Sequence, residues 1–190
     1  MDVVGRDSPR KLARAEVESL LERHMPQLRT YVRLRAGPVL RAREPLSDLV
    51  QSALREAYEA MGDFEYTSDG AFRAFLYTVA TNKIISKNRY HTAQRRAGER
   101  TEPLASGVFE LAQPGSSPSH SPSRQAERVE DLERLERAFA KLGEEDRQLL
   151  SMRRIFDIPV TQIARELGMP ESTVRWRLGV IMAELASEME

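Results

Sequence analysis

One stretch of this sequence, residues 71–96, combines side chains that bind nucleic acid. It reads AFRAFLYTVATNKIISKNRYHTAQRR and contains no acidic residue. Six residues in it are basic: Arg73, Lys83, Lys87, Arg89, Arg95 and Arg96. Basic side chains neutralise phosphates, and aromatic rings such as that of Tyr90 stack on unpaired bases. The stretch is therefore suited to gripping an opened DNA strand, and the simpler alternative is an amphipathic helix with a solvated basic end.

The composition argues against thiol catalysis and against metal sites. The 190 residues include no cysteine, which excludes disulfides, thiol catalysis and thiolate metal sites. The three histidines, at positions 24, 91 and 120, are scattered, so we expect neither a metal site nor a cofactor. We find no signal peptide and no membrane span, and expect a cytoplasmic protein that does not insert into membranes. The 29 basic and 29 acidic residues balance, so the basic stretch must be offset by acidic surface elsewhere.

The elements that position the basic stretch are predicted to be helices. Within it, apolar residues recur at helical spacing: Phe72, Phe75, Leu76, Val79, Ala80 and Ile84. Two further helical patterns precede it, at about 11–35, where Pro26 is expected to kink or divide the helix, and at about 47–61. Gly37 and Pro38 mark the break between these two patterns. Ser47 is the expected N-cap of the second helix, and Ser68 or Asp69 that of the basic helix.

The chain is predicted to be all-α, with two helical domains joined by a linker. Residues 1–10 are expected to be disordered, and residues 11–96 to form the first domain. Residues 97–125 are rich in serine, proline and glycine and are expected to form a flexible linker. Residues 126–190 return to helical periodicity and form the second domain.

A helix-turn-helix pattern occupies residues 160–185. Gly168 stands where the tight turn requires a left-handed residue, and Pro170 suits the start of the second helix. The inner face of that helix is predicted to contain Val174, Leu178, Ile181, Met182 and Leu185. Its opposite face carries Ser172, Thr173, Arg175, Trp176 and Arg177, a set suited to a DNA major groove. The alternative is a plain helical hairpin.

These features together resemble a bacterial RNA polymerase sigma factor of the extracytoplasmic-function type. DLVQSALREAYEAMGDFE is similar to the polymerase-binding helix of that family, and residues 71–96 resemble its promoter-melting helix. Residues 138–178 resemble its domain that reads the minus-thirty-five element. The resemblance covers nearly the whole chain and implies a transcription initiation factor that is not an enzyme.

The resemblance also implies roles for individual residues. It assigns core-polymerase binding to Ser47, Asp48, Leu49, Gln51, Ser52 and Arg55. It assigns minus-ten DNA binding to Asn82, Lys83, Lys87, Arg89, Tyr90, Arg95 and Arg96, with Asn82 helping to read a flipped base. It assigns minus-thirty-five binding to Ser172, Thr173, Arg175, Trp176 and Arg177. The implied partners are core RNA polymerase, promoter DNA, and an anti-sigma factor or a Ser/Thr kinase.

Four positions depart from the family pattern. Phe75 replaces a usual tryptophan, Trp176 replaces a small residue, and Ser47 and Ser52 stand where acidic residues are common. Phosphorylation of Ser47 or Ser52 would restore negative charge, so we expect it to switch polymerase binding. The alternative is that Ser47 is an N-cap and Ser52 a solvated helix residue.

Two other classes of protein compete with this interpretation. A stand-alone helix-turn-helix regulator has no use for an aromatic, basic strand-melting helix, and an adaptor protein would not co-purify with core polymerase. In the free chain, we expect basic surface of the first domain to attract acidic residues of the second and to hide the DNA-binding faces. The acidic residues are Glu127, Glu130, Asp131, Glu133 and Glu136.

Overall fold

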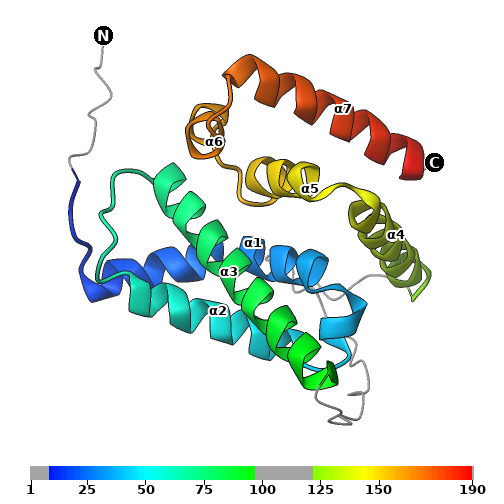
Figure 1. Ribbon diagram of the computed structural model, residues 1–190, viewed down its shortest axis with the longest axis horizontal. Coiled ribbons are helices and arrows are strands. Elements are labelled where there is room, and N and C mark those ends of the chain that lie inside the picture. The colour runs from blue at the N-terminus through cyan, green and yellow to red at the C-terminus, as the bar shows by residue number, and fades with distance from the viewer. Residues whose placement is uncertain (1–8, 97–121, 190) are drawn as a thin grey trace.

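The computed structural model describes residues 9–96 and 122–189, apart from the side chains of residues 38, 95, 96 and 122–129. The described residues form helices and no strand, which confirms the all-α prediction. In chain order the helices are α1 (Arg14–Arg41), α2 (Leu46–Ala60), α3 (Asp69–Arg96), α4 (Pro122–Lys141), α5 (Glu144–Leu150), the π-helical turn η1 (Ser151–Ile155), α6 (Val160–Leu167) and α7 (Glu171–Met189). Figure 1 shows α1, α2 and α3 packed together, with α5, α6 and α7 stacked above them.

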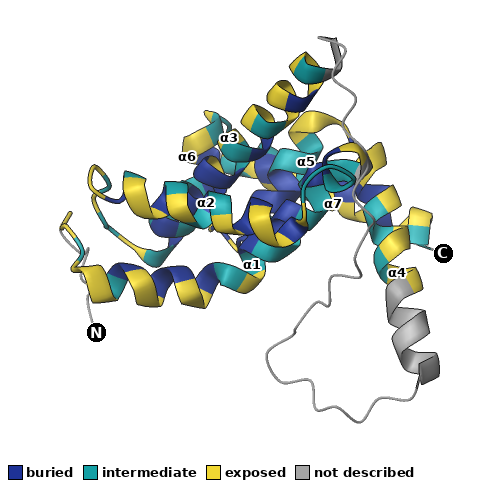
Figure 2. Ribbon diagram, turned by 90° about the horizontal axis from the view of Figure 1, so that it is seen from below, coloured by how far each residue is buried: buried dark blue, intermediate teal, exposed yellow. Residues whose placement is uncertain are grey.

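The first three helices pack their apolar faces against one another around a common core. Leu28, Leu49 and Leu76, one from each helix, are almost completely buried. The buried faces turn inward along α1 and α2 in Figure 2. The Ser68 hydroxyl accepts a hydrogen bond from the Ala71 amide at 3.1 Å and caps α3, as the sequence predicts.

The N-terminal half of the fold differs from the prediction at three places. The backbone stays helical through Pro26, and the only non-helical residue inside α1 is Gly37, with φ of 64°. Helix α2 begins two residues earlier than a Ser47 cap implies, so Pro45 rather than Ser47 occupies the N-cap position. Arg10, expected in the disordered N-terminus, exchanges two backbone hydrogen bonds with Tyr66 at 3.1 and 2.9 Å.

The second domain turns its chain through η1 before the helix-turn-helix. The Phe156 amide donates to the Ser151 carbonyl at 3.0 Å, a π-type hydrogen bond that widens the last turn. Asp157 follows with φ of 47°, a left-handed conformation that aspartate tolerates better than most residues. This turn leaves Phe156 and Ile158 fully buried. The predicted linker, residues 97–125, lies outside the described residues as far as residue 121, and α4 begins at Pro122.

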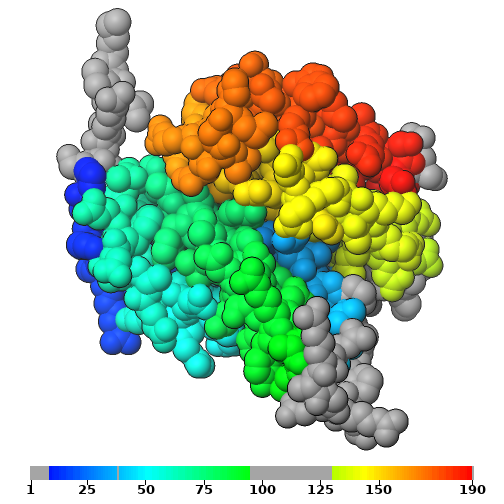
Figure 3. Space-filling model, in the orientation of Figure 1, coloured from blue at the N-terminus to red at the C-terminus, as the bar shows by residue number. Residues whose placement is uncertain are grey.

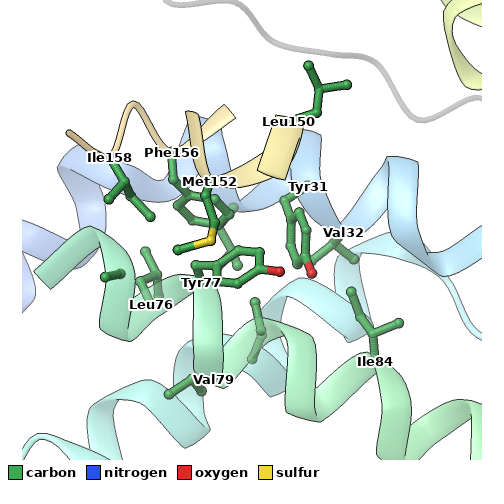
Figure 4. Close-up of a cluster of buried hydrophobic side chains, with 14 of the residues drawn as sticks. Tyr31, Val32, Leu76, Tyr77, Val79, Ile84, Leu150, Met152, Phe156 and Ile158 are labelled. Atoms are coloured by element: carbon green, nitrogen blue, oxygen red, sulfur yellow. The ribbon is translucent and has the colours of Figure 1, made fainter. Parts of the chain in front are cut away.

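An aromatic cluster joins the two domains. The Phe156 ring lies edge-on to those of Tyr31 and Tyr77, with centroids 5.3 and 5.7 Å away. Figure 4 shows Phe156 and Met152 of the second domain facing these two tyrosines of the first. The Thr81 hydroxyl donates to the Tyr77 carbonyl at 2.8 Å, so the Tyr31 hydroxyl donates to Thr81 at 2.6 Å. Tyr77 lies within the basic stretch of residues 71–96, yet it is a core residue.

Ion pairs also join the two domains. Glu136 of α4 accepts from Arg33 Nε at 2.5 Å and Arg41 Nη1 at 2.9 Å, and Arg35 pairs with Glu144 of α5. Of the acidic residues expected to attract the first domain, Glu130, Asp131 and Glu133 pair only within α4, and Glu127 lies outside the described side chains. The docking cations come mainly from α1 rather than from the basic end of α3. The second domain consequently lies over α1 and the N-terminal half of α3 (Figure 3).

Candidate nucleic-acid and polymerase interfaces

The C-terminal half of α3 presents the basic and aromatic side chains to solvent. Asn82 and Arg89 are exposed, and 57% of Tyr90 is accessible. Together with Ile85, Asn88, Thr92 and Ala93, Arg89 lines an open hollow on this face. Arg95 and Arg96 lie outside the residues whose side chains are described. The exposed part of this helix therefore offers an amide, a guanidinium and a phenol ring to a nucleic acid.

Two lysines of this stretch already have carboxylate partners. Lys83 pairs with Glu56 of α2 at 2.9 Å, and Lys87 pairs with Glu44 at 3.0 Å. His91 Nε2 also lies 2.6 Å from Glu44. Burial alone would raise the pKa of Glu44, but the hydrogen bonds from His91 and Lys87 outweigh it and hold this pKa below its ordinary value. Glu44 is thus an anion that ties the chain before α2 to α3.

Helix α2 carries an exposed polar row on the side away from the core. Ser47, Asp48, Gln51 and Arg55 are exposed, and Ser52 is half-buried. The Ser47 hydroxyl donates to Asp48 at 3.2 Å instead of capping the helix. Leu49, which the family resemblance groups with these residues, is only 1% exposed. Its side chain fills the core of the first domain and is not available to a partner.

The helix-turn-helix forms as the sequence predicts. Gly168 ends α6 with φ of 63° and ψ of 31°, the left-handed conformation that glycine adopts without steric cost. The Met169 amide then donates to the Ala164 carbonyl at 2.9 Å and closes the turn. Val174, Ile181 and Leu185 of α7 are buried against the domain, whereas Met182, expected on the inner face, is 37% exposed. Helices α6 and α7 of the helix-turn-helix therefore meet in a tight turn, and α7 has a defined outward face.

The outward face of α7 contains one large free side chain flanked by two paired arginines. Trp176 is 68% exposed, the highest fraction among the exposed large apolar side chains that the structure describes. Arg175 pairs with Glu171 at 2.6 Å. Arg177 pairs with Glu145 at 3.0 Å and with Asp146 at 2.6 Å, so it links α7 to α5. Ser172 is exposed and Thr173 half-buried on the same helix.

The structure leaves both candidate DNA-binding faces open. The second domain docks on α1 and the start of α3, so it covers neither Asn82 nor Trp176. Figure 1 shows α7 along one edge of the molecule and the C-terminal half of α3 near the opposite edge. The expectation that docking hides these faces is therefore wrong; docking instead fixes their separation.

Of the residues that join the domains, Glu136 was predicted from the sequence, but its partners on α1 were not. Arg35 and Tyr31 carry no local signal, because they lie on α1 within an ordinary mixture of charged and apolar positions. Arg73, counted with the DNA-binding stretch, pairs with Asp157 of the second domain at 3.1 Å. Gly70 lies close enough to Pro159 that an added Cβ would stand 3.1 Å from its Cδ.

Two kinds of feature, a metal-binding cluster and a membrane-spanning helix, are absent from the described part of the chain. It contains no group of three or more histidine or acidic side chains placed to hold a metal ion. None of its helices combines the length and the apolar character needed to cross a bilayer. Two docked helical domains, one with an exposed basic helix and one with a helix-turn-helix, define a DNA-binding protein.

Comparison with known proteins identifies the family. The model of Sigma-70 region 2 matches residues 20–96, and that of Sigma-70, region 4 matches residues 132–179. The ECF RNA polymerase sigma factor SigM of Mycobacterium tuberculosis, from strains Erdman and H37Rv, is 28% identical over 169 residues, which cover 89% of this chain and 74% of SigM. The solved structure of CnrH in complex with the cytosolic domain of CnrY shares the fold, with a TM-score of 0.56 and 21% identity, covering 92% of this chain and 88% of that one.

The chain belongs to the extracytoplasmic-function sigma factors of RNA polymerase. Proteins of this family are not enzymes. A sigma factor binds core RNA polymerase and promoter DNA, and this one directs the initiation of transcription. The region 2 match sets aside a stand-alone helix-turn-helix regulator, because that class lacks this domain.

Proposed function

We propose that this sigma factor binds core polymerase through the exposed row on α2 and promoter DNA through α3 and α7. The observation that carries this assignment is the outward exposure of all three faces while the domains are docked. On α2 the polymerase-facing residues are Ser47, Asp48, Gln51, Ser52 and Arg55. Leu49 supports this row from the core and is not part of it.

The minus-ten contacts are proposed for the C-terminal half of α3. Asn82 and Tyr90 are free to meet an unpaired base, and Arg89 a phosphate. Lys83 and Lys87 exchange their carboxylate partners for phosphates when DNA binds. Each lysine then trades one ion pair for another, so its charge stays paired when DNA binds. Arg95 and Arg96 are proposed to extend the same contact.

We further propose that the protein acts in the cytoplasm and that it acts by binding rather than by catalysis. A partner protein is proposed to restrain it. CnrH, which shares this fold, was solved in complex with the cytosolic domain of CnrY. The docked domains present α2, α3 and α7 in a fixed arrangement, and a single partner that grips both domains would keep them docked. A kinase acting on Ser47 or Ser52 is the second proposed route of control.

A charge reversal on α2 tests the polymerase contact. Asp48→Arg places a positive charge on the exposed row and should abolish co-purification with core polymerase and promoter-dependent run-off transcription. Asp63→Arg is the matched control, because Asp63 is equally exposed on the same domain but lies beyond the end of α2. Equal binding of core polymerase by wild type and Asp48→Arg would remove this row from the interface.

A further inference from the structure

We propose that α7 recognises the minus-thirty-five element through an apolar strip that contacts thymine methyl groups, while its two arginines are paired with carboxylates of the same domain. This inference rests on the proposed role of α7 in DNA binding and specifies its chemistry. The strip consists of Thr173, Trp176 and Val180. The arginines are Arg175 and Arg177.

The strip lies on one side of the helix. At about 100° per residue, Val180 is about 40° and Thr173 about 60° from the direction of Trp176. The buried residues Val174, Ile181 and Leu185 lie on the opposite side. Trp176 is 68% and Val180 is 48% exposed. Trp176 and Val180 thus form an exposed apolar face, with the half-buried Thr173 beside it, on the outer side of a second helix whose turn is that of a DNA-binding helix-turn-helix.

Arg177 is less available than its sequence position suggests, whereas 61% of the Arg175 side chain is exposed. Arg177 donates to Glu145 and Asp146, and only 24% of its side chain is exposed. Arg175 donates to Glu171 of its own helix at 2.6 Å. To contact guanine, Arg177 must break two ion pairs between α7 and α5. Trp176 needs no such rearrangement.

The chemistry of the major groove then selects the base. Among the base edges exposed there, the only apolar group is the 5-methyl of thymine. An indole ring packs on that methyl, and the Val180 side chain, one turn further along the helix, can meet a second one. An apolar strip of this kind discriminates thymine from cytosine by contact rather than by hydrogen bonds.

Replacing thymine by uracil removes the methyl group alone and gives a direct test. The full chain is assembled with core polymerase of the source bacterium, and a minus-thirty-five element is selected from duplexes randomised over that region. Each thymine of the selected element is then replaced by uracil, and the dissociation constant is measured for wild type and Trp176→Ser. For wild type, uracil should weaken binding about fourfold at one or more positions, the effect of removing one buried methyl.

The variants separate the apolar strip from the arginines. Trp176→Ser should lose the uracil penalty at the thymine that the indole contacts, Trp176→Phe should keep part of that penalty, and Arg175→Ala should keep all of it. Three results would each overturn the proposal. They are a selected element without thymine, uracil tolerated at every position, and a uracil penalty in Trp176→Ser equal to that of wild type at every position. If the chain fails to assemble with core polymerase or selects no element at all, the proposed function fails instead.

Discussion

Replacing Glu136 by alanine should loosen the docking of the two domains. Glu136 of α4 accepts from two arginines of α1, Arg33 and Arg41. Only 13% of the Glu136 side chain is exposed, and 17% and 27% of those of the arginines. Removing the carboxylate leaves two partly buried cations facing each other without the anion between them.

The size of the effect follows from this burial. Exposed ion pairs contribute roughly 0.2–1 kcal/mol, whereas breaking a buried pair costs about 3–5 kcal/mol. The Glu136 pairs lie between these limits, so we take about 2 kcal/mol for the loss of docking free energy. That value shifts the equilibrium between docked and open domains by a factor of about 30. The aromatic contacts of Phe156 with the first domain remain and oppose full separation.

Energy transfer between two dyes measures this shift. The chain contains no cysteine, so Ser19→Cys and Ser187→Cys, at exposed positions of α1 and α7, provide the only labelling sites. Transfer should fall in Glu136→Ala and fall further with salt. The matched control is Glu133→Ala, because the exposed Glu133 pairs only with Arg137 of its own helix at 4.0 Å. Identical transfer and identical salt titrations for the two variants would refute the ion-pair account of docking.

Three other perturbations have distinct expected outcomes. Arg177→Ala should lower the free energy of unfolding by about 1 kcal/mol in a denaturant titration, whereas Arg175→Ala should change it by less than about 0.5 kcal/mol. The pKa of Glu44 is lowered in the folded chain, so its contribution to stability is present above about pH 4.5 and is lost as the pH falls through the folded pKa. Glu44→Gln should therefore destabilise the chain at pH 7 and make its stability less sensitive to acid. Ser47→Glu and Ser52→Glu should raise the affinity for core polymerase above that of unmodified protein, measured by a binding titration.

Each of these outcomes can fail on its own. Equal stability of the two arginine variants would mean that the link from α7 to α5 contributes nothing. Unchanged acid unfolding in Glu44→Gln would show that its hydrogen bonds to His91 and Lys87 do not form in solution. Unmodified protein that binds core polymerase as tightly as both glutamate variants would exclude a phosphorylation switch.

Local features of the fold were predictable because they depend on neighbouring residues. The left-handed Gly168 and the capping Ser68 each act within a few positions; Gly168 is where the sequence places it, and Ser68 is one of the two expected caps. The prediction that Ser47 caps α2 was wrong. Pro45 lacks an amide hydrogen and can occupy the cap position one residue before the helix. Leu49 was misassigned because a resemblance between segments does not distinguish the outer from the inner face of a helix.

Long-range features of the fold were not predictable from pattern alone. Tyr77 lies among basic residues in the sequence, yet it is buried because Phe156, 79 positions later, packs against it. Arg33 and Glu136 are separated by 103 positions, so no periodicity connects them. Charge asymmetry predicted that the domains attract each other but did not identify which helix supplies the cations.

The position of Phe156 in the chain also has a consequence for synthesis on the ribosome. Residues 9–96 complete the first domain, but the ring that covers Tyr31 and Tyr77 belongs to a residue made 60 positions later. At about 5–20 residues per second, the two tyrosines stay uncovered for several seconds in every nascent chain. The first domain therefore emerges with an apolar patch that chaperones can bind until Phe156 docks and covers it.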